Sequence, residues 1–375
     1  MDRRELRKAW AVGDVIVSPL GYDTAGNFRL VSQGYSGIRP VKIGQRDTVL
    51  AAAFDELPEA GDDITSFERI CFQALSSLLK ETDFDPSKTL LVLSTTKGNV
   101  DLIEKRFTDH PRLNLPATAA FIKSSFGFAS QITVSNACTS GVAAIIAAAR
   151  FIEQGRFDYA VVLGADILSE FVVSGFQSLL ALSNGPCLPF DVSRSGINLG
   201  EGAAAILLTS RVEEFSEKEP VQITGMGTSN DANHISGPSR TGEELALAIS
   251  RALKGANVTI DHIDFVSAHG TATLYNDEME AKAFNLSGLG DVPLHSLKGY
   301  FGHTLGAAGV IETIIGMESL RRGELIQSLG YSSPGTSQSL NIITEKVLRP
   351  LNTFLKTSSG FGGCNAAIML NKQSN

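Results

Sequence analysis

A cysteine at position 138 stands where a short apolar strand is expected to lead into a helix. The residues around it, 134–141, read Val-Ser-Asn-Ala-Cys-Thr-Ser-Gly. The first turn of a helix offers unpaired N–H groups and a partial positive charge, which stabilise a thiolate and can hold a developing oxyanion. An arbitrary cysteine is most often a small buried hydrophobe, and we interpret Cys71 and Cys187 in that way. The position of Cys138 instead indicates a nucleophile.

A histidine at position 269 directly follows another expected strand, residues 263–266, in the segment Ser-Ala-His-Gly-Thr-Ala-Thr. Ligand sites of α/β proteins lie at the carboxyl ends of strands. The hydroxyl groups of Thr271 and Thr273 could hydrogen-bond a polar arm of a substrate there. A single histidine is by default a core or surface residue, and that interpretation is kept for His110, His234, His262 and His295.

Two glycine-rich segments complete the set of residues that could take part in a reaction. Residues 298–309, Lys-Gly-Tyr-Phe-Gly-His-Thr-Leu-Gly-Ala-Ala-Gly, place His303 before a helix of small residues. Residues 358–365, Ser-Ser-Gly-Phe-Gly-Gly-Cys-Asn, predict positive φ angles or close backbone approach, as in a loop that lines a catalytic chamber or in a plain tight turn. The orders GxxxxGK[ST] and GxGxxG are absent from these segments, so phosphate-cradle and dinucleotide-binding interpretations have little support.

The elements that must position these residues alternate between strands and helices. Short apolar, β-branched runs predict strands at 90–94, 132–134, 159–163, 204–208, 263–266 and 366–370. Helical patterns occupy 140–154, 241–255, 277–284 and 306–322. This alternation predicts βαβ units with largely parallel sheets that are covered on both faces.

The chain divides near its middle. Residues 211–219 form its most charged and least periodic stretch, and Pro220 follows them. A strand, a turn of small residues and an Ala/Gly-rich helix occur at 132–150 and again at 292–320, which indicates two related halves. We therefore expect an N-terminal half, residues 1–215, with Cys138, and a C-terminal half, residues 216–375, with both candidate histidines.

Composition narrows the class of protein. Of the 375 residues 43% are hydrophobic and 19% charged, as in a compact α/β enzyme, and the net charge of −8 does not favour nucleic acid or an anionic membrane as a partner. The longest apolar stretch, 141–149, is far shorter than the roughly 20 residues that span a bilayer. Residues 1–7 carry charges of both signs with no apolar segment after them, which predicts a cytoplasmic protein.

The four cysteines form no CxxC pair, so no metal is expected.

In order along the chain, Cys138, His269, His303 and the Gly-Phe-Gly-Gly segment at 360–363 resemble the β-ketoacyl-acyl carrier protein synthases of the thiolase superfamily, in particular the decarboxylating enzymes with one cysteine and two histidines. Further matching residues are 189–191, Arg194, Gly196, 200–202, 231–234 and Pro238, so the resemblance extends from about residue 12 to 370. Three positions depart from the family pattern. They are Cys364, where threonine is usual, Ser195, where an acidic residue is common, and Leu274, where proline often stands.

The resemblance implies a fold and a reaction. The fold is α/β and thiolase-like, with two related halves, each a five-stranded sheet, in a five-layer αβαβα arrangement. Cys138 would take an acyl group from a carrier-protein thioester. A malonyl carrier protein would then lose carbon dioxide, and the resulting enolate would attack the acyl group on Cys138.

The resemblance also implies roles for single residues. His269 and His303 would donate hydrogen bonds to the enolate oxygen, and the N–H groups of Cys138 and Phe361 would form an oxyanion hole, with Phe361 also acting as a gate. The remaining residues implied by the resemblance are the supporting pair Lys298 and Glu312 and the substrate-binding residues Thr271, Thr273 and Gly360.

Partners and rival functions follow from the same resemblance. The protein would need no cofactor of its own, because its substrates arrive on the phosphopantetheine of acyl carrier protein. It would form a homodimer, or a heterodimer with a related synthase subunit. The alternatives are a thiolase-type acyltransferase with Cys364 as second cysteine, a chain-length-factor-like partner subunit, and a cysteine hydrolase. The short chain and the departures favour a polyene or polyketide pathway over housekeeping fatty acid synthesis.

Overall fold

The computed structural model describes residues 7–44, 48–61, 63–232 and 237–372, and His234 lies outside these ranges. Its main feature is a ten-stranded sheet in the order β11-β10-β14-β15-β9-β1-β8-β6-β4-β5. Five strands come from the first part of the chain: β1 (Ala9–Val17), β4 (Thr89–Ser94), β5 (Ser130–Val134), β6 (Tyr159–Asp166) and β8 (Gly202–Thr209). Five come from the second part: β9 (Val221–Asn230), β10 (Phe265–Ser267), β11 (Leu294–His295), β14 (Thr353–Gly360) and β15 (Cys364–Lys372).

The two groups of five strands repeat one arrangement. Reading outward from the middle, the orders β1-β8-β6-β4-β5 and β9-β15-β14-β10-β11 match strand for strand, and three residue pairs between 9–11 and 221–223 join them. The structure thus has the two related five-stranded halves of the expected thiolase-like class. We propose that the boundary near 215 separates these halves, since β8 ends at Thr209 and β9 begins at Val221.

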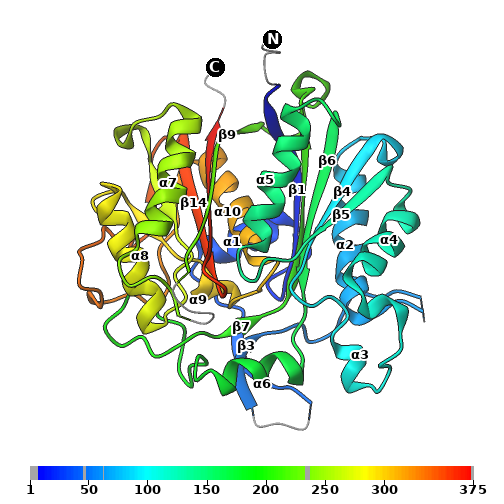
Figure 1. Ribbon diagram of the computed structural model, residues 1–375, viewed down its shortest axis with the longest axis horizontal. Helices are drawn as coiled ribbons and strands as arrows, with labels where there is room; N and C mark the ends of the chain where they lie inside the picture. Colours follow the sequence, from blue (N-terminus) through cyan, green and yellow to red (C-terminus); the bar gives the residue numbers. More distant parts are fainter. Residues whose placement is uncertain (1–6, 45–47, 62, 233–236, 373–375) are drawn as a thin grey trace.

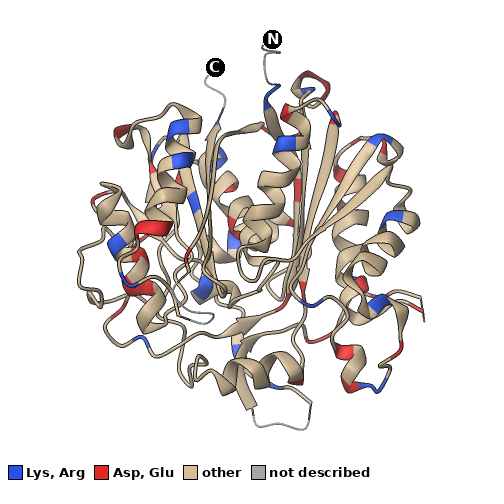
Figure 2. Cartoon of the chain, in the orientation of Figure 1, with Lys and Arg blue, Asp and Glu red and all other residues tan. Residues whose placement is uncertain are grey.

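Helices form the other layers (Figure 1). Helices α2 (Ser66–Glu81) and α4 (Leu115–Phe126) cover the outer face of the first half, and α7 (Glu243–Ala256) and α8 (Leu274–Leu286) cover that of the second. Between the halves lie α5 (Ser140–Glu153) and α10 (Ala308–Arg322), together with α1 (Thr24–Ser32). Charged residues lie mostly on the outer helices and loops, which leaves the central layers largely apolar (Figure 2).

The remaining elements are short. They are α3 (Asp101–Glu104), α6 (Glu170–Ser178), α9 (Lys298–Phe301), the 3-10 turns Pro86–Lys88, Pro111–Leu113, Val212–Glu214 and Ile260–His262, and the strands β2 (Ile38–Lys42), β3 (Thr48–Ala52), β7 (Leu199–Gly200), β12 (Glu324–Leu325) and β13 (Val347–Leu348).

The prediction of largely parallel sheets is wrong for the middle of the sheet. Strands β4, β5 and β6 pair in parallel, as do β10, β11 and β14. The central pairs from β6 to β14 are antiparallel. The reason is local for β14 and β15, because residues 360–364 form a tight turn that returns the chain beside itself, and a hairpin can only pair antiparallel strands.

The central helices meet at glycines. A Cβ atom on Gly141 of α5 would lie 2.8 Å from the Cα of Gly309 in α10, and one on Gly309 would lie 2.6 Å from the backbone N of Val142. Only glycine allows this approach of two backbones. Because Cys138 precedes α5 and His303 precedes α10, the crossing of these helices brings both residues to one place.

Candidate active site

Cys138 lies in the tight turn between β5 and α5. Ala137 holds a positive φ of 47°, and the hydroxyl of Ser140 donates to the carbonyl of Ala137 at 2.6 Å while accepting from the backbone N–H of Asn136 at 2.7 Å. The hydroxyl of Ser358 on β14 donates to the carbonyl of Cys138 at 3.0 Å. These bonds fix the cysteine just before the N-terminus of α5, the position predicted from the sequence.

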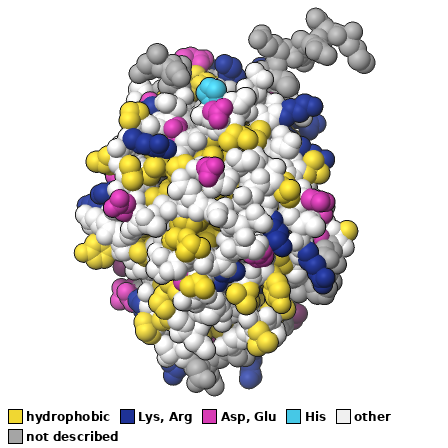
Figure 3. Space-filling view, turned by 90° about the vertical axis from the view of Figure 1, so that its left-hand side faces the viewer, with side chains coloured by type: hydrophobic (Ala, Val, Ile, Leu, Met, Phe, Trp, Pro, Cys, Tyr) yellow, Lys and Arg dark blue, Asp and Glu magenta, His cyan; other side chains and the backbone are white. Residues whose placement is uncertain are grey.

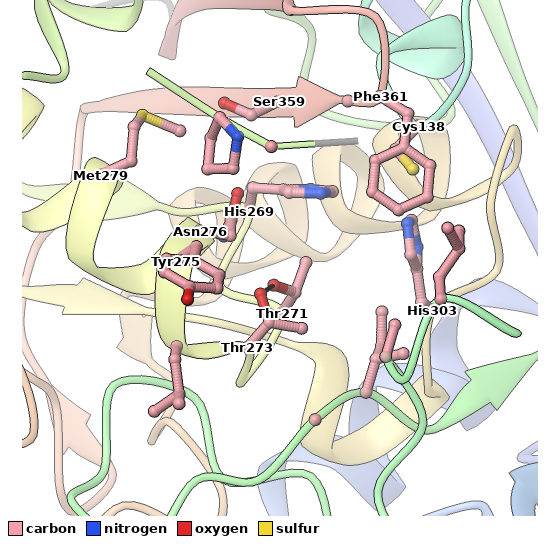
Figure 4. Close-up of a pocket in the computed structure, with 18 of the residues that line it drawn as sticks. Cys138, His269, Thr271, Thr273, Tyr275, Asn276, Met279, His303, Ser359 and Phe361 are labelled. Carbon is pink, nitrogen blue, oxygen red and sulfur yellow. Dashed lines mark hydrogen bonds between the residues drawn. The ribbon is translucent and has the colours of Figure 1, made fainter. Parts of the chain in front are cut away.

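Two imidazoles lie beside this thiol. The sulfur of Cys138 and ring nitrogens of His269 and His303 all lie within 4.8 Å of one another, and the two rings meet edge to face with centroids 5.2 Å apart. Figure 4 shows both rings directed toward Cys138, His269 from the loop after β10 and His303 from the loop before α10. The three sequence-predicted residues, 131 and 34 positions apart along the chain, are thus brought together in one buried cluster.

The backbone of the His303 loop fixes the proton of its ring. The N–H of Leu305 donates to Nδ1 of His303 at 3.3 Å, so a neutral imidazole here carries its proton on Nε2. This Nε2 is buried and has no hydrogen-bond partner among the described residues. His303 therefore presents a free N–H donor to the site.

The backbone around His269 is held on both sides. The N–H groups of His269 and Gly270 donate to the two carboxylate oxygens of Glu280, at 2.9 and 2.6 Å. The ammonium of Lys298 donates to the carbonyl of His269 at 3.1 Å and also pairs with Glu312. Lys298 is 0% exposed. The supporting pair expected at Lys298 and Glu312 is therefore in place, beside the backbone of His269.

Both imidazoles are held in the neutral form. Burial lowers the pKa of His269 well below its usual value, and Lys298, His303 and Lys356 lower it further. For His303 burial is again the first cause, followed by Lys298, Lys97 and Lys356. A neutral imidazole has one donor and one acceptor nitrogen. His303 offers its Nε2–H as a donor, because its Nδ1 already accepts from Leu305, whereas His269 can either donate a hydrogen bond or accept a proton.

Burial acts against ionisation of the Cys138 thiol. It raises the pKa of Cys138 to about 11, against the lowering by Lys298, Lys97 and the backbone N–H of Phe361. The loss of water thus outweighs the nearby positive charges. The stabilised thiolate expected from the helix N-terminus stays a prediction, which concerns the reacting site.

A cavity of about 480 Å³ opens at this cluster. The predicted substrate-binding residues Thr271, Thr273, Gly360 and Phe361 all line it. The two threonine hydroxyls lie 2.9 Å apart, and a Cβ atom on Gly360 would lie 3.1 Å from the backbone N of Cys138. Gly360 thus lets the loop approach the cysteine, whereas Gly362 and Gly363 hold positive φ angles of 83° and 76°.

Phe361 stands at the mouth of the cavity with 37% of its surface exposed. Its ring stacks on Phe176 of α6, with centroids 6.0 Å apart and planes 27° apart. The sequence analysis did not identify Phe176, because it belongs to a short helix that carries no motif of its own.

Cys364 takes no part in the cluster. Its thiol contacts the side-chain oxygens of Asn136 and Asn230, at 2.8 and 3.3 Å. It is not one of the described residues that line the cavity. This placement gives no support to a second cysteine in the reaction.

Comparisons with known proteins agree with this geometry. Residues 106–214 match the model of the β-ketoacyl synthase N-terminal domain, and residues 221–332 match that of the C-terminal domain, so that the two cover more than half of the chain. The chain belongs to the β-ketoacyl synthase family. The domain models meet close to the boundary that we propose between the halves.

Relatives of the family span the whole chain. A putative mitochondrial 3-oxoacyl-[acyl-carrier-protein] synthase of Schizosaccharomyces pombe is 27% identical and covers 95% of this chain and 97% of its own. A putative polyketide β-ketoacyl synthase of Streptomyces cyaneus is 29% identical, with 97% and 98% covered. A ketosynthase of Xenorhabdus doucetiae, solved with its chain length factor, has a TM-score of 0.87 at 25% identity, with 98% of each chain covered.

Proposed function

We propose that this protein is a β-ketoacyl-acyl carrier protein synthase, an acyltransferase that joins an acyl group to a malonyl unit with loss of carbon dioxide. The observation that carries the proposal is the buried trio at the end of the cavity, in which the thiol of Cys138 and two neutral imidazoles lie within 4.8 Å. A thiol supplies the nucleophile for a covalent acyl intermediate, and two donors suit a thioester oxygen that becomes negatively charged.

The first half-reaction transfers the acyl group to Cys138. The thiol gives up its proton, and an adjacent neutral imidazole can accept it. The sulfur then attacks the carrier thioester, a new C–S bond forms, and the carrier thiol leaves with the proton. The N–H groups of Cys138 and Phe361 would hold the oxyanion of the tetrahedral intermediate, since Phe361 N–H already lies at the sulfur.

The second half-reaction extends the chain. The malonyl carrier protein loses its carboxylate as carbon dioxide, and the electron pair of that C–C bond moves to an enolate whose oxygen accepts hydrogen bonds from His269 and His303. The enolate carbon attacks the acyl carbonyl on Cys138. A C–C bond forms, the C–S bond breaks, and the released thiolate takes up a proton.

In this proposal the substrates arrive on a phosphopantetheine arm, and the chain needs no cofactor of its own. Thr271 and Thr273 offer hydroxyl groups to the amides of such an arm. We treat the trio as catalytic and not as a metal site. An acyl carrier protein is then the partner that delivers both substrates.

The rival assignments have less support. A thiolase-type acyltransferase would use Cys364, which is bonded to Asn136 and Asn230 away from the cavity. A chain-length-factor-like subunit would lack the nucleophile, whereas Cys138 is present and paired with two imidazoles. A cysteine hydrolase would leave the second imidazole unexplained.

The subunit partner and pathway remain proposals. We propose a dimer, formed with a second copy or with a related subunit, as in the Xenorhabdus complex of a ketosynthase with its chain length factor. Relatives bear names from both fatty acid and polyketide synthesis, and we favour a polyene or polyketide pathway on the departures at Ser195, Leu274 and Cys364. No helix of the described ranges is both long and apolar enough to cross a membrane.

The test is turnover with loaded carrier proteins. The protein is incubated with malonyl-loaded acyl carrier protein and with carrier proteins that bear saturated acyl groups of several lengths. We expect carbon dioxide release, a carrier-bound product two carbons longer, and an acyl group on the Cys138 peptide by mass spectrometry. Absence of both acylated Cys138 and carbon dioxide release, for every acyl length, would contradict the proposal.

A further inference from the structure

A second buried lysine lies next to the pair that was predicted from the sequence. Lys356 sits in the middle of β14 and is 0% exposed. Its Nζ lies 2.6 Å from Oε2 of Glu312 and donates to the carbonyl oxygens of Ser267 and Ala268, each at 3.2 Å. A buried ammonium is costly unless it is paired and hydrogen-bonded, and all of its contacts here are to the strand end that carries His269 and to Glu312.

The two lysines act on consecutive peptides. Lys356 holds the carbonyls of Ser267 and Ala268, and Lys298 holds the next carbonyl, that of His269. On the opposite side Glu280 accepts the N–H groups of residues 269 and 270. The backbone that carries the His269 ring is therefore clamped from β14, α9 and α8 together.

Lys298, Lys356 and Glu312 together carry one more positive than negative charge. Glu312 lies between the two ammonium groups, with Oε1 toward Lys298 and Oε2 toward Lys356. A second carboxyl group, Glu280, also interacts with Lys356, but burial raises its pKa to about 7, so it offsets this charge only in part at neutral pH. The titratable and charged groups that face the imidazoles from the surrounding elements are Lys97, Cys138, Asp166, Glu280, His295, Lys298, Glu312 and Lys356.

We propose that Lys356 is a positioning residue of this site. It fixes the peptides that precede His269, and together with Lys298 it places positive charge beside both imidazoles. The inference rests on the proposed function for its effect on decarboxylation, but its effect on imidazole titration does not depend on that function.

The proposed effect of the Lys356 charge agrees in direction with the pKa shifts of both imidazoles. Burial and Lys298 are the first two causes that lower the pKa of His269 and of His303, and Lys356 adds to them after His303 in the first case and after Lys97 in the second. Glu312, in contrast, has a lowered pKa that two ammonium groups maintain against its burial. Removal of Lys356 would leave one balanced pair, Lys298 and Glu312, and would raise the pKa of both imidazoles.

The test compares Lys356→Met with Lys346→Met. Both changes remove one positive charge, but Lys346 is exposed and lies outside the site. Acylation of Cys138 by intact mass, carbon dioxide release from malonyl-loaded carrier protein, and the titration of histidine side chains by NMR are measured from about pH 8 down to the lowest pH at which each variant stays folded, as followed by thermal unfolding.

For Lys356→Met we expect acylation within about twofold of the parent and carbon dioxide release about tenfold slower at pH 8, because a slightly displaced donor affects the oxyanion step most. The imidazole titrations and the acid limb of carbon dioxide release should move up by about one pH unit, the effect of one nearby charge. Lys346→Met should change neither quantity. Carbon dioxide release and titrations that match those of Lys346→Met would overturn the proposal.

A second variant separates charge from position. Lys356→Met combined with Glu312→Gln has the same excess of one positive charge as the parent, so its acid limb should return to the parental pH while the loss at pH 8 remains. If Lys356→Met does not fold, the double variant serves as the test of the positioning role. A rate of carbon dioxide release at pH 8 equal to that of the parent would then overturn this role. A parent protein that releases no carbon dioxide would sink the proposed function instead, and the NMR titrations would still test the charge.

Discussion

Burial raises the pKa of the Cys138 thiol more than the positive charges around it lower that pKa. The residues next to Cys138 are arranged to compensate for this. A thiol with a pKa of about 11 is a weak nucleophile at neutral pH, so it must lose its proton as the acyl group arrives. The two imidazoles are neutral for the same reason, burial, and burial therefore prepares proton acceptors next to a protonated thiol. Burial is thus the first cause of the resting state of all three side chains, and the nearby lysines add to its effect on the two imidazoles.

This account predicts the pH dependence of thiol alkylation. The raised pKa means that the thiolate fraction of Cys138 grows about tenfold for each pH unit between 7 and 10. The rate of its modification by iodoacetamide, followed by mass spectrometry of the Cys138 peptide, should rise in the same proportion. A rate that levels off below about pH 8.5 would show a stabilised thiolate and contradict the raised pKa.

A second prediction distinguishes the two cysteines near the site. Cys138→Ala should abolish acyl transfer and leave the fold intact, because no other nucleophile belongs to the trio. Cys364→Thr and Cys364→Ala should both stay within a few-fold of the parent in acyl transfer, since the Cys364 thiol donates to two asparagine side chains and does not belong to the trio. Equal damage from Cys364→Ala and Cys138→Ala would favour the thiolase-type alternative.

Among single residues, those that belong to sequence motifs could be predicted. Residues whose role depends on a partner distant in sequence could not. Cys138, His269 and His303 stand at strand ends or helix starts, where local sequence is informative. Lys356 lies inside a strand of mixed polarity, and its role depends on its contact with Glu312, which is 44 positions earlier in the sequence. The one signal in the sequence was a lysine among residues that form a buried strand.

Among the elements, the crossing of α5 and α10 determines where the site forms. Both helices are rich in apolar and small residues, a pattern visible in the sequence, and both were predicted within about two residues of their observed bounds. The strands β1, β9 and β14 were missed. Glycine, serine and threonine dilute the apolar pattern of β9 and β14. The apolar run of β1 is interrupted only by Gly13 and Asp14 and was a signal that the prediction did not use. Helix α8 begins at Leu274, three residues before its predicted start.

The crossing itself can be tested by adding one methyl group. In Gly141→Ala the new Cβ would lie 2.8 Å from backbone atoms of Gly309 and Val310, which cannot move without shifting α10. We expect a loss of about 1–3 kcal/mol in the free energy of unfolding, measured by urea denaturation, together with reduced acylation of Cys138.

Gly175→Ala is the matched control. Gly175 lies within α6, and a Cβ atom there would meet no described atom within 4 Å. Its replacement should be neutral or stabilising by up to about 1 kcal/mol, because alanine favours the helix. If both variants lost a similar free energy of unfolding, the loss in Gly141→Ala could not be attributed to the close approach of α5 and α10.

The whole molecule has an open edge at β5, which pairs only with β4 among the described strands (Figure 1). Such an edge carries unpaired backbone groups and favours pairing with another chain. The face in Figure 3 shows acidic and basic side chains interspersed among hydrophobic ones.

We therefore predict that the protein is not a monomer in its working form. Light scattering at micromolar concentration should give twice the monomer mass for the isolated chain, or for its complex with a co-expressed related subunit. A chain that stays monomeric and binds no such subunit would contradict the proposed dimer.

The measurement that tests the central claim most directly separates the two half-reactions. Acylated Cys138, by intact mass, and released carbon dioxide are followed in parallel for the parent, His269→Ala, His303→Ala and the control His262→Ala, whose histidine is exposed. Acylation depends chiefly on Cys138, whereas decarboxylation needs both imidazoles on the malonyl thioester oxygen. We predict substantial acylation in both site variants with carbon dioxide release slowed by a factor of order 10² to 10³, the usual effect of losing one oxyanion donor. Carbon dioxide release that is unchanged in both variants would contradict the roles assigned to the two histidines.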